Sequence, residues 1–319
     1  MTSSEDETVV AHRATAHWRV RAGMSMLAIV IVVVSAALYF ATRKPDPLTA
    51  EILVIGDSQI SFGAGPTLSG FFSDLPNQCR DVAKSDQQIA LLRKKRFSMI
   101  GTRSTSIQSW VTQKGRPWEL LCHKDKRWGV NASVWGAVKP EKRRYVQIGE
   151  GELFQFCQPD RPPIQNLFAP GYYRPELLMI FVGGNGAGRL ARNPDLAQQD
   201  VDQFVKDVPR GLGCLFMMTA PVYQTSQNDR RLTAQANLRK AFGKHKERCS
   251  FVDGHTPATR AAIEGQDQYF RRDETGKVKD PYHADKTAGA EFLKLRRKPL
   301  CRALIRQFEA VDKARRKAS

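Results

Sequence analysis

The chain has 319 residues, of which 41% are hydrophobic, and its formal net charge is +18 at pH 7. This length and apolar content supply one large domain with room for an insertion, and they leave too little chain for two long domains. The charge favours polyanionic partners, although a solvated basic face without a specific partner is the alternative. The basic residues gather in four clusters, Arg93 to Arg96, Lys124 to Arg127, Lys142 to Arg144 and Lys294 to Lys317.

An uncharged stretch of 21 residues, Ala22 to Thr42, follows a basic N-terminus. As a helix it would span roughly 30 Å, the thickness of one hydrocarbon core. The flanking arginines and lysines favour an N-terminus in the cytoplasm. A cleaved signal peptide, with a small-residue site at Ser35 to Ala37, is the alternative and would export the rest of the chain equally.

We therefore expect a tail at 1–21, a transmembrane helix at 22–42, a linker at 43–50 and an exported domain at 51–319. This makes a single-pass protein of the inner (cell) membrane with a periplasmic or extracytoplasmic domain. For an exported chain, acidic polysaccharide or anionic lipid fits the charge better than nucleic acid, which is not expected as a partner.

The domain opens with an apolar, β-branched run from Ile52 to Ile55, which predicts a buried strand. Helical spacing follows from Leu68 to Leu92. A second strand, Arg96 to Ile100, is predicted to end at Gly101. Residues at about 110–170 are rich in proline and show alternating apolar positions, which predicts a β-rich insertion.

The second half of the domain alternates apolar runs with helical patterns. Strands are predicted at Leu177 to Val182, Cys214 to Thr219 and Ser250 to Asp253, and helices at Pro194 to Val208, Arg231 to Phe242 and Ala288 to Leu295. Strands that alternate with helices imply parallel pairing with right-handed crossovers. The fold class expected is therefore α/β, a three-layer α/β/α sandwich with a parallel five-stranded sheet.

All six cysteines follow the uncharged stretch, and an even number in an oxidising compartment favours disulfides. Cys122 and Cys157 flank the insertion and are the preferred pair. Cys214 and Cys249 open two neighbouring predicted strands, so they could pair or remain buried thiols. The sequence contains no Cys-x-x-Cys motif and no histidine-rich spacing, which argues against a structural zinc, and no metal site is predicted.

A serine lies where the first strand turns into a helix, in Gly56-Asp57-Ser58. Such a turn can expose a nucleophilic hydroxyl, although an ordinary helix-capping turn is the alternative. His283 is the best candidate for its base, because Asp280 precedes it by three residues and Pro281 restrains the turn between them. Of the other histidines, His255 is expected to be an ordinary loop residue. The resulting catalytic prediction is Ser58, His283 and Asp280.

Acyl transfer also needs donors for the oxygen that becomes negative. Asn185 follows the strand that ends at Val182, and Gly101 follows the second strand. Because carboxyl ends of parallel strands meet at one edge, these residues and Ser58 should lie together. The predicted oxyanion hole comprises the Asn185 side chain with the backbone N–H groups of Gly101 and Ser58. A tight turn is the alternative explanation for Gly183 to Asn185.

A competing motif runs from Gly186 to Ala191 and fits the loose dinucleotide pattern G-x-G-x-x-A. The next strand, Cys214 to Thr219, is followed by alanine and proline, with no carboxylate to hold a ribose. No cofactor is therefore expected.

The same blocks resemble the SGNH (GDSL-type) hydrolases. Ser58 in Gly-Asp-Ser matches the first block of that family, Gly101 the second, Asn185 in Gly-Gly-Asn the third, and Asp280-x-x-His283 the fifth. The resemblance covers roughly residues 51 to 295 outside the insertion. It implies a flavodoxin-like α/β/α fold and a serine esterase or O-acyl transferase that needs no metal or cofactor.

The function expected from the residues and the resemblance is a membrane-anchored serine esterase. Its substrate would be an O-acyl ester, chiefly an O-acetyl ester, on an acylated carbohydrate of the cell envelope. Two alternatives stay open: an O-acyltransferase that uses the same Ser-His-Asp triad, and a non-catalytic basic envelope protein that binds polyanions.

Overall fold

The computed structural model describes residues 50–93, 95–122, 132–139, 144–150, 157–158, 160–170 and 172–318, together with Val32 and Ser35. The chain divides into two compact units, Met1–Lys44 and Pro45–Ser319. The predicted tail and linker, nearly all of the predicted transmembrane helix at 22–42, and the basic cluster at 124–127 lie outside the described residues. Within the described part, no helix combines the length and the apolar character that crossing a bilayer requires.

Five apolar strands run parallel through the centre of the domain. They are β1 (Ile52–Gly56), β2 (Phe97–Thr102), β5 (Leu177–Phe181), β6 (Gly213–Met217) and β7 (Cys249–Val252). Each matches a predicted strand to within two residues at either end. Their spatial order is β2-β1-β5-β6-β7, so the direction in which strands are added reverses between β1 and β5.

Two further strands make the sheet larger than predicted. β3 (Ala132–Lys139) pairs antiparallel with β2, and β4 (Arg144–Glu150) pairs antiparallel with β3. Within the residues that the structure describes, the sheet therefore has seven strands, and the predicted β-rich insertion supplies two of them, β3 and β4. The physical reason is the free edge of β2, whose unpaired backbone groups β3 satisfies. Two short helices, α6 (Arg116–Cys122) and α7 (Pro163–Leu167), account for other parts of the insertion.

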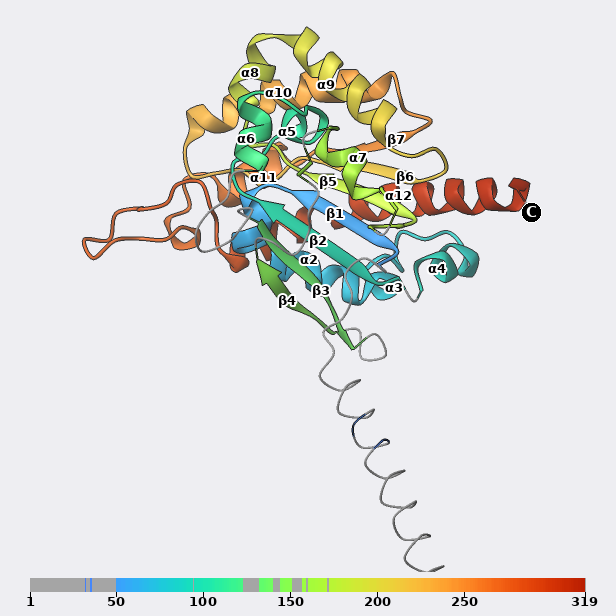
Figure 1. Cartoon of the computed structure of the whole chain (residues 1–319). Helices are drawn as coiled ribbons and strands as arrows, with labels where there is room; N and C mark the ends of the chain where they lie inside the picture. The colour runs from blue at the N-terminus through green and yellow to red at the C-terminus, as the bar shows by residue number, and fades with distance from the viewer. Residues whose placement is uncertain are drawn as a thin grey trace, which may run out of the picture. The chain divides into compact units, whose positions relative to one another are not determined.

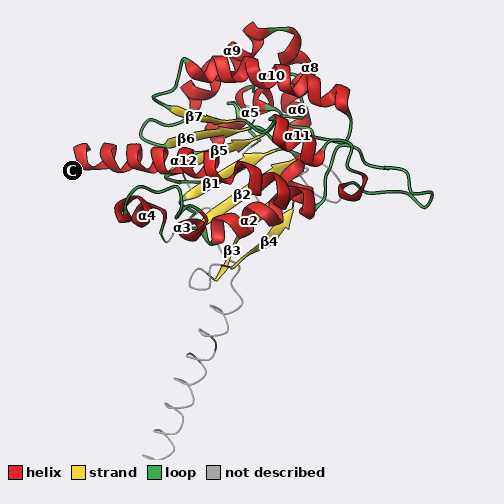
Figure 2. Ribbon diagram, turned by 180° about the vertical axis from the view of Figure 1, so that it is seen from behind, coloured by secondary structure: helices red, strands yellow, loops and turns green. Residues whose placement is uncertain are grey.

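Helices cover both faces of the sheet, as Figures 1 and 2 show from opposite sides. One core contains Leu53 and Ile55 of β1, and the other contains Ile52 and Val54, as expected for a strand buried on both faces. The first core packs beneath α5 (Ile107–Val111), α6, α7, α8 (Ala187–Arg192), α9 (Pro194–Asp207) and α10 (Thr225–Gly243). The second packs beneath α2 (Gly65–Ser73), α3 (Leu75–Gln78), α4 (Asp86–Leu92), α11 (Pro257–Ile263) and α12 (Lys286–Ala318).

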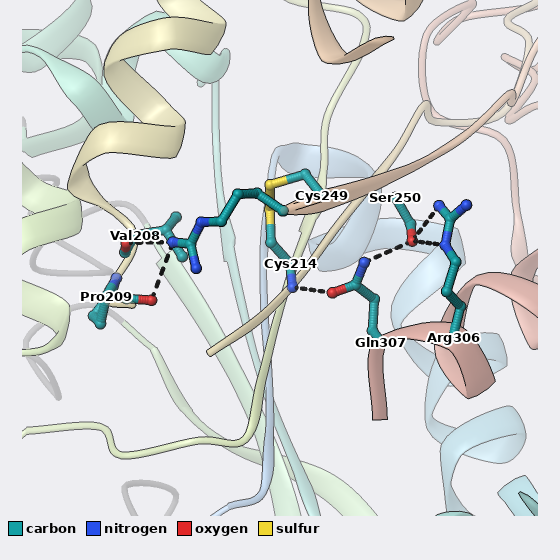
Figure 3. Close-up of a disulfide and its surroundings, with 8 residues drawn as sticks. Val208, Pro209, Cys214, Cys249, Ser250, Arg306 and Gln307 are labelled. Atoms are coloured by element: carbon teal, nitrogen blue, oxygen red, sulfur yellow. Dashed lines mark hydrogen bonds between the residues drawn. A yellow bond between two sulfur atoms is a disulfide. The ribbon is translucent and has the colours of Figure 1, made fainter. Parts of the chain in front are cut away.

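The six cysteines form three disulfides. The predicted Cys122–Cys157 bridge is confirmed, and Cys214 pairs with Cys249 across the starts of β6 and β7. The third bridge joins Cys79 to Cys301, residues separated by 222 positions, and connects the end of α3 to α12. Figure 3 shows how α12 also braces the Cys214–Cys249 bridge: the Gln307 amide accepts the N–H of Cys214 at 2.9 Å.

Candidate active site

Ser58 lies just beyond β1, which ends at Gly56, a position where neighbouring atoms leave no room for a side chain. A Cβ on Gly56 would lie 2.5 Å from both the Phe181 carbonyl oxygen and the Ile60 side chain. The turn continues into helical residues Ser58 and Gln59, then into a π-helical segment, η2 (Ile60–Ala64), and α2. The Ser58 backbone N–H therefore belongs to the first turn of a helix, where such groups have no partner within the helix.

His283 and Asp280 lie in the loop between the short 3₁₀ helix η4 (Asp267–Tyr269) and α12. An isolated antiparallel bridge between Phe270 and Ala284 closes the base of this loop. The Asp280 carboxylate accepts the backbone N–H of Tyr282 at 3.1 Å and that of His283 at 3.2 Å. These bonds form a tight turn that points the carboxylate at its own histidine.

The three predicted catalytic side chains are in hydrogen-bonding contact. Nδ1 of His283 lies 2.9 Å from Oδ2 of Asp280, and its Nε2 lies 2.8 Å from Oγ of Ser58. The imidazole also stacks on the Phe62 ring, with 4.1 Å between ring centroids. Burial raises the pKa of Asp280, but the bonds from His283 and Tyr282 outweigh this effect and leave the pKa below its usual value. The carboxylate is therefore ionised at neutral pH, which suits it to accept the histidine N–H and to stabilise an imidazolium.

Direct contacts hold the serine helix against the histidine loop. Nε2 of Gln59 donates to the Tyr282 carbonyl oxygen at 2.5 Å, and Thr67 donates to the Lys286 carbonyl oxygen at 3.3 Å. Between them the backbones nearly touch, because a Cβ on Gly63 would lie 2.1 Å from the Ala284 carbonyl oxygen. The distance between Ser58 and His283 is thus set by packing between η2, α2 and the residues that lead into α12.

Asn185 follows β5 and lines the same cavity as Ser58. It is half-buried, and its side chain makes no hydrogen bond with any residue that the structure describes. The buried Asp57 carboxylate accepts the N–H of Gln59 at 2.9 Å. Burial raises the pKa of Asp57, and the N–H groups of Gln59 and of Gly184, the residue before Asn185, oppose this rise. Asp57 therefore interacts with both the turn after β1 and the turn after β5, the turns that carry Ser58 and Asn185.

Gly101 occupies a different position from the other predicted donors. It is buried within β2, paired with Gly56 on one side and Ser133 on the other, and it is not among the residues that line the cavity. A Cβ there would lie 2.8 Å from the Ile60 side chain, so its lack of a side chain lets η2 pack onto the strand. The residues of this loop that do reach the cavity are Arg103 and Ser104.

Ser104 has φ +62°, the left-handed region that favours glycine. A non-glycine residue in this conformation costs on the order of 1–3 kcal/mol and persists where surrounding contacts impose it. Here Thr105 imposes it by donating to the carbonyl oxygens of Gly56 and Thr102. The strand runs one residue past Gly101, which is why the sequence-based prediction missed Arg103 and Ser104.

A cavity of about 380 Å³ opens at this edge of the sheet. Its lining comes from the turns after β1, β2 and β5, from α10 and from the histidine loop. The residues are Asp57, Ser58, Gln59, Phe62, Arg103, Ser104, Gly184, Asn185, Gln227, Arg231, Tyr282 and His283. Among the described residues, no three His, Cys, Asp or Glu side chains are grouped so that they could hold a metal ion.

Arg231 is the main residue that the sequence-based prediction overlooked. It lies on the buried stripe of α10 with Asn228, Ala234, Gln235 and Leu238, at helical spacing. An arginine at an otherwise apolar or amide position of such a stripe is a signal that the sequence does contain. His255, predicted to be an ordinary loop residue, is in a loop but buried, with 2% of its surface exposed.

Comparisons with known proteins identify no family for this chain. No family model matches the sequence, and no curated protein matches it either. Among solved structures, the chain is similar to the crystal structure of a DUF4886 family protein from Bacteroides uniformis. The two share 11% sequence identity over 82% of this chain and 83% of that one, with a TM-score of 0.39.

Proposed function

We propose that the protein is a serine esterase of the SGNH (GDSL-type) class, which removes O-acyl groups, chiefly acetyl groups, from an envelope glycan. One observation carries the proposal: Ser58, His283 and Asp280 form a continuous hydrogen-bonded relay from opposite ends of the domain. Nucleophilic catalysis by a serine requires such a relay, with the histidine as the base and the aspartate as the group that orients it.

The position of the relay in the sheet supports the proposal. Ligands of open α/β sheets bind at the carboxyl ends of the strands, where the strand order reverses. Here the reversal lies between β1 and β5, which are followed by Ser58 and Asn185 respectively. The order β2-β1-β5-β6-β7 and the helices on both faces fit the flavodoxin-like three-layer arrangement that the resemblance implies.

In the proposed mechanism, Ser58 attacks the carbonyl carbon of the ester while Nε2 of His283 accepts the hydroxyl proton. Asp280 holds the Nδ1–H tautomer and stabilises the imidazolium that forms. The imidazolium then protonates the departing sugar oxygen, which leaves an acyl-serine. Water, deprotonated by the same histidine, releases the acid and restores the serine.

The negative oxygen of the tetrahedral intermediate needs donors in a fixed position. Asn185 lines the cavity with a side-chain amide that no described residue uses, and the Ser58 N–H lies in the first helical turn. We assign the oxyanion hole to these two groups, with the strand residue Gly101 supporting the helix that carries the serine. Loss of one such donor typically costs about 3 kcal/mol of barrier.

Export to an oxidising compartment is part of the proposal. All six cysteines are disulfide-bonded, a state that persists outside the cytoplasm. With the uncharged stretch at 22–42 as a single membrane anchor, the domain would face the periplasm or cell exterior, where acylated glycans are present.

The test uses the full-length chain in detergent, treated with a fluorophosphonate probe and assayed with p-nitrophenyl acetate. We expect the probe on the peptide that contains Ser58, and loss of both labelling and turnover in Ser58→Ala. Ser73→Ala is the matched control, because its hydroxyl only donates to the Gly70 carbonyl oxygen on α2. A wild-type chain that is neither labelled nor active, yet binds acidic glycan in a salt-sensitive way, would refute the esterase and favour the polyanion binder. Acetyl groups recovered on an added sugar in place of free acetate would identify the transferase.

A further inference from the structure

The cavity beside Ser58 has a buried arginine in its wall. Arg231 lies on α10 and exposes 5% of its surface, yet it lines the cavity together with Asn185 and Tyr282. Its guanidinium lies against the turn after β5, with Nη2 closest: a Cβ on Gly184 would lie 2.5 Å from Nη2. Because Gly184 has no side chain, the guanidinium fits against this turn. Gly184 immediately precedes Asn185, the proposed oxyanion donor.

The hydrogen-bonding capacity of Arg231 is mostly unused. Nη1 donates to the Ala220 carbonyl oxygen at 3.2 Å, and this is its one hydrogen bond with the described residues. Nε is buried without a partner. No carboxylate among the described residues forms a salt bridge with Arg231. A buried guanidinium without an ionic partner is costly, and such a group calls for an explanation beyond packing.

Asp57, the carboxylate whose charge acts on Arg231, does not supply that partner. Asp57 attracts Arg231 electrostatically, but the two form no salt bridge, and the Asp57 carboxylate accepts the N–H of Gln59 at 2.9 Å. Burial lowers the pKa of Arg231 to about 10, so the group remains cationic at neutral pH. A second cation, Arg103, lines the cavity from the turn after β2 and lies 5.6 Å from the centre of the Phe62 ring.

We propose that Arg231 binds a carboxylate of the substrate, so that the ester cleaved at Ser58 is carried by an acidic sugar. The inference rests on the proposed esterase function and adds its substrate class. A planar guanidinium with free donors matches a carboxylate, which accepts two parallel hydrogen bonds. Arg103, which also lines the cavity, adds positive potential from the turn after β2, and the net charge of +18 favours encounter with an acidic glycan.

The substrate test compares two esters that differ only in charge: a mono-O-acetylated methyl glucuronoside and the corresponding uronamide. Both present the same acetyl ester and the same leaving hydroxyl, and acetate release gives kcat/KM for each. A hydrogen bond to a charged group predicts that the full-length wild-type chain prefers the acid by about 10- to 100-fold. Equal values, or a preference for the amide, would overturn the inference without any variant.

The variant test asks whether Arg231 is the source of the preference. In Arg231→Met the acid-to-amide ratio should fall to near one, and in Arg231→Lys it should recover in part. Arg230→Met is the matched control, because it removes one exposed positive charge from the adjacent position of α10 and should keep the wild-type ratio. A purely architectural role for Arg231 would lower both rates together and leave the ratio unchanged, which would refute the inference.

A binding measurement separates failure of this inference from failure of the esterase proposal. Calorimetry of Ser58→Ala with the acetylated uronoside and its amide reports recognition without catalysis. Preferential binding of the acid by Ser58→Ala, with a wild-type chain that is inactive and unlabelled, would refute the esterase and keep the carboxylate site. An active enzyme whose Ser58→Ala variant binds acid and amide equally would keep the esterase and refute the site.

Discussion

The contact between Gly63 and Ala284 offers a sharp test of how the relay is aligned. In Gly63→Ala the new Cβ would lie 2.1 Å from the Ala284 carbonyl oxygen, and ordinary contact requires at least 3.4 Å. The histidine loop must therefore move by about 1.3 Å, because the obstructing atoms belong to the backbone of Ala284 and Asp285. Because His283 immediately precedes Ala284, it would be displaced too, and its 2.8 Å contact with Ser58 would break.

A misplacement of about 1 Å in a catalytic constellation costs about 100-fold in rate, so kcat with p-nitrophenyl acetate should fall to that extent. Overpacking should also lower the free energy of unfolding by about 1–3 kcal/mol, measured in urea. Gly70→Ala is the control: it lies inside α2, nothing approaches its Cβ position within 4 Å, and alanine stabilises a helix by up to about 1 kcal/mol. A folded Gly63→Ala variant with wild-type kcat and wild-type fluorophosphonate labelling would refute this account of the alignment.

Three further outcomes are expected. Asp280→Asn should reduce kcat by about 10⁴-fold, because an amide favours the wrong histidine tautomer; steady-state turnover measures this, and a loss under tenfold would contradict the relay. Burial lowers the pKa of His255 to about 3. Between pH 6.5 and this value, His255 is therefore protonated in the unfolded chain and neutral in the folded chain. Stability should therefore fall by about 2 kcal/mol from pH 7 to pH 5, and urea unfolding of His255→Leu should lack this slope if the residue is its source. Replacing Cys79 and Cys301 by alanine should lower the free energy of unfolding by about 5 kcal/mol, because that bridge closes the longest loop; removing either bridge that closes 35 residues should lower it by about 4 kcal/mol. Denaturant unfolding of the three variants measures these losses, and a smaller loss for the Cys79–Cys301 variant than for the others would contradict the prediction.

The central strands were predictable because each is apolar enough to be buried on both faces. Ile52 to Ile55 is the clearest case, with successive side chains entering opposite cores. The position of Ser58 followed from the same pattern, since a serine directly after a buried strand and a glycine turn must lie at the sheet edge. The partner histidine was identified because Asp280 lies within the reach of a single turn.

Features that depend on distant packing could not be read from the sequence. The alternating run from Tyr145 to Ile148 indicates a strand and lies in β4, but the pairing of β4 with β3, and of β3 with β2, depends on which sheet edge is left open. The Cys79–Cys301 bridge joins residues 222 positions apart, and no local pattern selects that pair. The position of Gly101 was predicted wrongly by one or two residues relative to the end of its strand. Because β2 continues to Thr102, the turn that reaches the cavity begins at Arg103.

The two halves of the proposed site are held by different means. Ser58 and Asn185 are fixed by strand register, because β1 and β5 pair residue by residue up to Gly56 and Phe181. His283 follows no strand of the sheet, and its position depends on α12 packing against η2 and α2.

That packing is reinforced far from the cavity. Arg297 on α12 forms a salt bridge with Asp81 at 2.5 Å, and the Cys79–Cys301 bridge lies beside it. Because α12 is a continuous helix from Lys286, restraint at Arg297 and Cys301 limits how far its first turn, and hence the histidine loop, can move. Reduction of this one disulfide should therefore weaken the alignment of His283 with Ser58 while leaving the relation between Ser58 and Asn185 intact.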